Sequence, residues 1–125
     1  MSAALESMVD AGPLPSVPEG GVVGLVVDGV SVALVRWRDE LFALRDVCPH
    51  QQGQVCRGFV RPVLESEEVG EAAVDRERGV IICPWHRWEY DLRTGVGLRR
   101  ERFRLRTYRV EVVDGRLYID LGRRG

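Results

Sequence analysis

The sequence is poor in several residue types, and each shortage narrows what the protein can do. Of its 125 residues only two are histidine and three are cysteine, and all eighteen basic residues are arginine, from which we draw no mechanism. The net charge of −1 argues against general binding to nucleic acids or membrane surfaces. No apolar run approaches the length of a membrane span, and residues 1–21 lack the basic stretch and apolar core of a secretory signal. We therefore expect a cytoplasmic protein.

The overall composition is that of a folded protein. Apolar residues make up 45% of the chain and charged residues 30%, which is typical of globular domains rather than of disordered segments. A chain of 125 residues can build one modest hydrophobic core. We therefore expect a single domain.

Both histidines lie close to a cysteine. The pairs are Cys48 with His50 and Cys83 with His86, and each pair encloses a proline. Proline fixes the backbone for a tight turn, so each short segment can direct a sulfur and an imidazole the same way. Thiolates and imidazoles are ligands that transition metals prefer. The sequence therefore predicts a metal centre held by Cys48, His50, Cys83 and His86.

Two metal centres suit this set of ligands. One is a single tetrahedral zinc ion, and the other is a [2Fe–2S] cluster with cysteines on one iron and histidines on the other. Zinc sites more often pair Cys-x-x-Cys with two histidines, instead of placing one of each in both segments. Buried histidines beside inert cysteines would explain one pair, but they explain two matched pairs poorly.

The residues around the pairs resemble a known family. Residues 83–95 resemble the second cluster loop of Rieske ferredoxins and of the Rieske domains of ring-hydroxylating oxygenases, and residues 48–60 are similar to the first loop. Residues 113–121 resemble the last hairpin of the same family. The resemblance covers residues 20–121. It implies one Rieske-type [2Fe–2S] cluster, bound by Cys48, His50, Cys83 and His86.

The resemblance also implies a function and partners. The family's small members are one-electron carriers, so we expect a ferredoxin that passes electrons from a reductase to an oxygenase. An alternative is an accessory small subunit of a larger reductase, as in nitrite reductase, and a third is a structural zinc-binding module without a redox role. Both histidines are used by the cluster, so none remains for a mononuclear catalytic iron. We expect redox protein partners, no nucleic acid and no membrane, and no catalysis by this chain alone.

The pattern of apolar residues predicts strands and no convincing helix. Asp28-Gly29 and Asp114-Gly115 are typical hairpin turns between such strands. The expected strands are residues 22–27, 30–37, 41–45, 79–82, 88–92, 105–113 and 116–121. With the family resemblance, this indicates an all-β fold, a small antiparallel barrel or sandwich with a protruding cluster-binding subdomain. We expect an N-terminal extension over 1–19, the Rieske domain over 20–121 and a tail over 122–125.

Four further features are left with open roles. The acidic segment 61–78 lengthens the separation of the ligand pairs, and we expect a surface insertion or, alternatively, a lid or docking element. The basic run from Arg99 to Arg109 predicts either a solvated strand face or a patch for an acidic redox partner. Cys56 is expected to be a buried, inert thiol or, alternatively, a redox-sensitive thiol near the cluster. Family members of high potential have serine where this chain has Trp88, so we expect a low potential within the Rieske range.

Overall fold

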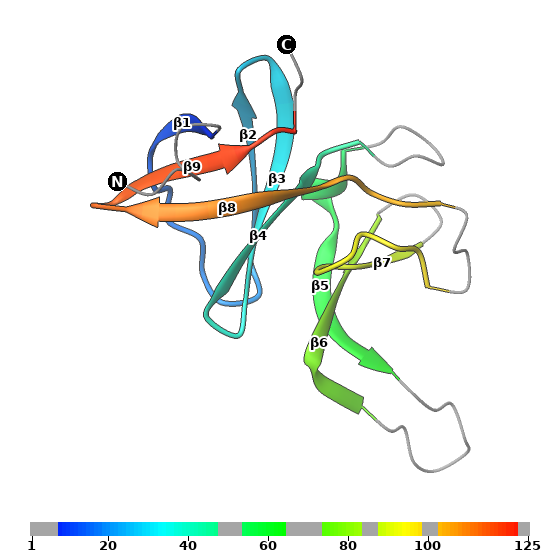
Figure 1. Cartoon of the computed structure of the whole chain (residues 1–125). Coiled ribbons are helices and arrows are strands. Elements are labelled where there is room, and N and C mark those ends of the chain that lie inside the picture. Colours follow the sequence, from blue (N-terminus) through cyan, green and yellow to red (C-terminus); the bar gives the residue numbers. More distant parts are fainter. Residues whose placement is uncertain (1–7, 48–53, 65–73, 84–87, 99–102, 123–125) are drawn as a thin grey trace, which may run out of the picture.

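The computed structural model describes residues 8–47, 54–64, 74–83, 88–98 and 103–122, and these form two antiparallel sheets (Figure 1). The larger sheet is a curled half-barrel with the strand order β1-β9-β8-β4-β3-β2, and the smaller one has the order β5-β6-β7. The strands are β1 (Val9–Pro13), β2 (Val22–Val27), β3 (Val30–Trp37), β4 (Glu40–Arg45), β5 (Phe59–Leu64), β6 (Val74–Ile82), β7 (Glu89–Asp91), β8 (Thr107–Val113) and β9 (Arg116–Asp120). A short 3-10 helix, η1 (Val55–Arg57), precedes β5. The described residues contain no α-helix, which confirms the all-β prediction.

Two-residue turns fix the register of the larger sheet. The central residues of the β2–β3 turn, Asp28 and Gly29, have φ values of 49° and 79°, and those of the β8–β9 turn, Asp114 and Gly115, have 51° and 75°. Positive φ at both central positions suits the right-handed twist of the strands that a hairpin joins. The two hairpins predicted from Asp-Gly are therefore confirmed, and the tight turn between β3 and β4 adds a third.

Strand β3 lies at the centre of the molecule and is buried on both faces. Ala33 and Val35 belong to the core between the two sheets, whereas Val32 and Leu34 belong to the core inside the half-barrel, and all four are fully buried. Successive side chains of a strand point to opposite faces, so a strand with no solvent on either side needs a nearly continuous apolar run. The sequence of β3 supplies that run.

Two strands lie where the sequence analysis expected none. Strand β1 falls within residues 1–19, expected as an N-terminal extension, and pairs with β9 near the other end of the chain. Strand β5 pairs with a β6 that begins at Val74, so paired strands occupy both ends of the expected insertion 61–78. Residues 65–73, the middle of that insertion, lie outside the described residues. The proposed domain boundaries remain predictions.

No helix among the described residues is long and apolar enough to cross a membrane.

Candidate metal centre

Cys83 is the one predicted ligand among the described residues. It follows β6 directly, and its side chain is fully buried. Cys48, His50 and His86 lie outside the described residues, so their assignment as ligands stays a prediction. Within the described ranges no group of three or more histidine, cysteine, aspartate or glutamate residues comes together. The structure therefore describes the residues that support the predicted centre and one of its predicted ligands.

The segment that contains His86 is closed at its base. Ile82 of β6 pairs with Glu89 of β7, and the next residue outward, Cys83, donates its amide hydrogen to the carbonyl oxygen of Trp88 at 2.8 Å. Residues 84–87 therefore begin and end at two hydrogen-bonded neighbours. A hydrogen-bonded strand pair of this kind fixes the positions of both ends of the short segment that connects the two strands.

The segment that contains Cys48 and His50 ends beside Cys83. The chain returns through η1 to Gly58, whose amide donates to the carbonyl of Val55 at 2.9 Å. A Cβ atom on Gly58 would lie 1.9 Å from the carbonyl oxygen of Ile82, so only glycine fits between η1 and β6. This close approach places the end of the first predicted cluster loop against the start of the second.

The residues at the bases of both predicted cluster loops belong to one apolar core. Val55 from η1 and Cys83 from the end of β6 belong to the same buried cluster, which contains residues of both sheets. The other fully or nearly fully buried members are Ala33, Val35, Leu44, Ile81, Tyr90, Leu92 and Leu105. Cysteine sulfur is the usual ligand of iron–sulfur clusters, and an apolar surround excludes water from it. The buried Cys83 therefore fits an iron ligand on the protein side of a cluster.

Polar contacts hold the turn after β7. The buried carboxylate of Asp91 accepts hydrogen bonds from the amides of Arg93 at 2.9 Å and Thr94 at 3.1 Å. Gly95 then takes a φ of 77° with its Cα facing the backbone carbonyl of Leu105, where a Cβ would lie 1.9 Å away. An aspartate that bonds to the amides two and three residues ahead stabilises a tight turn. These residues thus hold the C-terminal end of β7, the end away from residues 84–87 in the chain.

The strands beside the centre carry a partly buried ion pair and an aromatic pair. Arg61 of β5 bonds to Glu89 of β7 across the small sheet. Trp88, where high-potential relatives were expected to have serine, packs edge-on against Phe103 with ring centroids 4.9 Å apart. Val55 and Gly58 lie within residues 48–60, whose similarity to the first loop was noted in the sequence, but their supporting contacts, like that of Phe103, are tertiary and were not predicted.

The comparison with known protein families decides the identity of this centre. The family model described as Rieske [2Fe-2S] domain matches residues 7–109. The chain belongs to the Rieske [2Fe-2S] family. The resemblance noted in the sequence is thereby confirmed, and the cofactor is a Rieske-type [2Fe–2S] cluster. The structural zinc alternative is set aside.

Relatives of known role match most of the Rieske chain. The ferredoxin component of a naphthalene 1,2-dioxygenase system from Pseudomonas aeruginosa is 32% identical over 117 residues, which cover 93% of this chain and 97% of that protein. The ferredoxin subunit of an anthranilate 1,2-dioxygenase from Burkholderia cepacia is 29% identical over 92 residues, or 73% of this chain and 70% of that protein.

Solved structures share the fold. The ferredoxin of carbazole 1,9a-dioxygenase from Nocardioides aromaticivorans has a TM-score of 0.64 and 25% identity, covering 90% of this chain and 95% of that one. A protein described as an NADH-dependent nitrite reductase small subunit from Mycobacterium tuberculosis has a TM-score of 0.70 and 25% identity, covering 90% and 92%. The Rieske fold is therefore common to both functional classes that the sequence analysis considered.

Proposed function

We propose that this Rieske protein is the ferredoxin component of an oxygenase system, which accepts one electron at a time from a reductase and passes it to an oxygenase. The 32% identity to a dioxygenase ferredoxin over nearly the full length of both chains carries this proposal. The cluster supplies a one-electron redox couple. The cytoplasmic location and the reductase partner are part of the proposal.

The ligand assignment follows the two pairs. We propose that Cys48 and Cys83 hold one iron and that His50 and His86 hold the other. The complete burial of Cys83 supports a cysteine-bound iron on the protein side, since the surrounding apolar core excludes water from its sulfur. Histidine in place of two thiolates removes negative charge from the ligand set, which raises the reduction potential above that of all-cysteine ferredoxins.

The second candidate function is an accessory small subunit of a larger reductase. The observation that favours it is the similarity to the nitrite reductase small subunit, which has the higher of the two TM-scores given above. Rates of electron transfer separate the two functions. The dithionite-reduced protein should be oxidised quickly by the terminal component of a naphthalene-type dioxygenase and slowly by the catalytic subunit of an NADH-dependent nitrite reductase, and the reverse order would favour the second function.

The ligand assignment has its own test. His86→Ala should abolish the rhombic electron paramagnetic resonance signal of the anaerobically purified, dithionite-reduced protein, because one iron loses a ligand. Cys56→Ser is the matched control, since Cys56 is expected to be an inert thiol, and it should keep the signal and two irons per chain. A His86→Ala protein with an unchanged signal, or a Cys56→Ser protein without one, would refute the assignment.

A further inference from the structure

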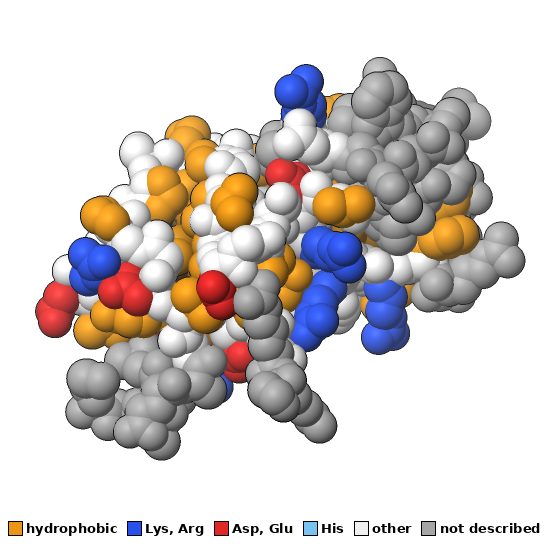
Figure 2. All heavy atoms as spheres, turned by 90° about the horizontal axis from the view of Figure 1, so that it is seen from above, with side chains coloured by type: hydrophobic (Ala, Val, Ile, Leu, Met, Phe, Trp, Pro, Cys, Tyr) orange, Lys and Arg blue, Asp and Glu red, His pale blue; other side chains and the backbone are white. Residues whose placement is uncertain are grey.

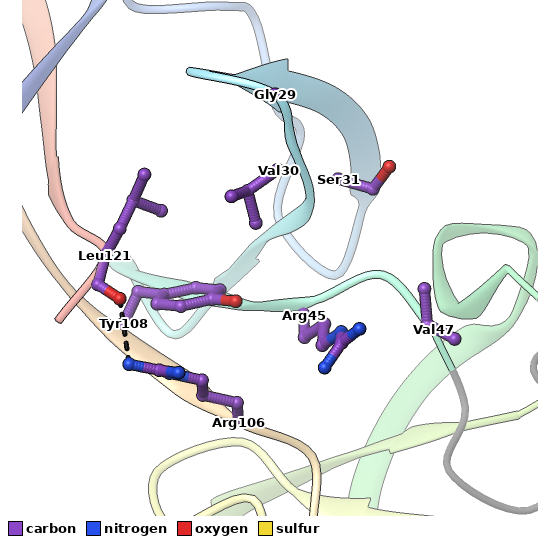
Figure 3. Close-up of a pocket in the computed structure, with 8 residues that line it drawn as sticks. All are labelled: Gly29, Val30, Ser31, Arg45, Val47, Arg106, Tyr108 and Leu121. Atoms are coloured by element: carbon purple, nitrogen blue, oxygen red, sulfur yellow. Dashed lines mark hydrogen bonds between the residues drawn. The ribbon is translucent and has the colours of Figure 1, made fainter. Parts of the chain in front are cut away.

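A hollow of about 380 Å³ lies at the end of the half-barrel from which the chain leaves β4 (Figure 3). Four segments surround it: the start of β3, the end of β4 with Val47, the start of β8 with the residue before it, and Leu121 after β9. The lining residues are Gly29, Val30, Ser31, Arg45, Val47, Arg106, Tyr108 and Leu121. Its size is within the range of pockets that bind small molecules.

Two arginines that line this hollow occupy directly opposite positions on neighbouring strands, with their guanidinium groups on either side of the hollow (Figure 3). The register of β4 and β8 pairs Ala43 with Tyr108 and Leu44 with Thr107, and it continues to Arg45 opposite Arg106, where the Arg45 amide donates to the Arg106 carbonyl at 2.8 Å. Like charges directly opposite in an antiparallel pair are destabilising. A negatively charged group between the two guanidinium groups would replace this repulsion with a net attraction.

The protein supplies no such group from the described residues. None of the residues that line the hollow is acidic, and the ion pairs within the described ranges involve neither Arg45 nor Arg106. Arg106 donates a hydrogen bond to the carbonyl of Leu121 at 2.9 Å and lies over the ring of Tyr108, with its guanidinium carbon 5.6 Å from the ring centroid. These contacts hold Arg106 in place. Arg45 is exposed, so its positive charge is available to a ligand.

The hydrogen-bond donors at the hollow, the Tyr108 hydroxyl and the guanidinium groups, suit an oxyanion. Figure 3 shows the Tyr108 hydroxyl at the end of the ring that points toward the Arg45 side of the hollow. A guanidinium group presents paired N–H donors that match the oxygens of carboxylate and phosphate groups. Val30 and Leu121 supply apolar walls for a small organic body.

Arginine side chains also gather on one part of the molecular surface. Figure 2 shows several arginine side chains gathered on one part of the face, whereas most of the acidic side chains visible there lie toward the other end. Such a separation of charge raises the local concentration of small anions.

We propose that the hollow at Arg45 and Arg106 is a binding site for a small oxyanion, a phosphate- or carboxylate-bearing molecule. Two guanidinium groups and the Tyr108 hydroxyl recognise its charged oxygens. The described residues that line the site include Val47, which precedes the predicted ligand Cys48, and none of them is itself a predicted cluster ligand.

Calorimetric titration of the cluster-loaded protein tests the site, with inorganic phosphate and succinate as probes and sodium chloride of equal ionic strength as the reference. Saturable binding of either probe is expected. Arg45→Gln should weaken it about tenfold or more, because a charge-assisted hydrogen bond is lost. Phosphate binding alone would identify a phosphate-type ligand, and succinate binding alone a carboxylate-type ligand.

The control is Arg109→Gln, which removes the same charge from β8 at an exposed residue that contacts Glu111. It should bind the probes as the unchanged protein does. Arg106→Gln should also lose binding, but it gives up the contact with Leu121, so Arg45→Gln is the decisive variant. No binding beyond that seen with chloride, or equal binding by the Arg45→Gln protein, would overturn the proposal.

Discussion

The two sheets of this Rieske protein are held together by different means. The six-stranded sheet contains three tight hairpins whose strands pair residue by residue, and β3 is buried on both faces. Its register shifts only in the edge pair of β1 with β9, between Asp10 and Pro13. The three-stranded sheet has an irregular register between Pro62 and Val63, and it depends on close backbone approaches at Gly58 and Gly95. Packing of apolar side chains stabilises the six-stranded sheet, whereas the three-stranded sheet holds the ends of its connecting segments in place. Substitutions in the two sheets should therefore have different effects on stability and on the cluster.

Gly58→Ala should have the largest effect, because its Cβ would lie 1.9 Å from the Ile82 carbonyl oxygen, an atom of the backbone. We expect a loss of about 4 kcal/mol or more in the free energy of unfolding, together with loss of iron and of the visible cluster spectrum. Denaturant unfolding and iron analysis measure both.

Gly115→Ala is the matched control for this change. Gly115 has a positive φ of 75° but nothing within 4 Å of the added carbon, so the cost should be only about 1 kcal/mol. The cluster should stay intact. Equal losses in the two proteins would show that the contact with Ile82 adds nothing to the cost of Gly58→Ala.

Leu34→Ala should destabilise the protein and spare the cluster. Leu34 is fully buried in the core inside the half-barrel, away from the core that contains Cys83. Removing its side chain should cost about 3 kcal/mol of unfolding free energy. The protein that remains folded should keep an unchanged electron paramagnetic resonance spectrum, and an altered spectrum would show that the two cores are coupled.

Glu19 should make the larger sheet sensitive to acid. Its carboxylate accepts hydrogen bonds from the amides of Arg38 at 2.6 Å and Asp39 at 2.9 Å in the β3–β4 turn. These bonds, with the Asp39 amide contributing most, hold the pKa of Glu19 below its usual value of 4.5. A lowered pKa in the folded state adds stability above pH 4.5 that is lost as the pH falls through the folded pKa.

The test compares the unchanged protein with Glu19→Gln in denaturant unfolding from pH 7 downward. The unchanged protein should be the more stable at pH 7, and the difference should shrink below pH 4.5. A difference that stays constant across this range would exclude the carboxylate charge as its cause.

The smallest effect is expected where an exposed ion pair joins the two sheets. Arg93, after β7, contacts Glu40 of β4 through two hydrogen bonds of 2.9 Å, and both side chains are at least half exposed. Glu40→Gln should cost about 0.5 kcal/mol of unfolding free energy at low salt, and less at high salt, because solvent and ions screen the pair. A larger cost that does not change with salt concentration would show that screened attraction between charges is not the main contribution of the pair.

Local features were predictable from the sequence because the residues that decide them are neighbours. Asp28-Gly29 and Asp114-Gly115 specify their turns through backbone preferences alone, and the apolar pattern of residues 30–37 predicts the strand β3 but not its burial on both faces. Strand β1 was missed, since Val9–Pro13 contains a glycine and a proline and has no alternating pattern. It is a strand because β9 offers its edge to pair with.

For the metal centre, the types and spacing of the predicted ligands could be read from the chain, because cysteine and histidine carry their chemistry in the side chain and the pairs are only a few residues long. The folded structure was needed to show that Gly58 and Ile82 meet, that Val55 and Cys83 share one buried core, and that Arg45 lies opposite Arg106. Contacts between residues far apart in the chain depend on how whole strands pack, and no short segment of sequence contains that information.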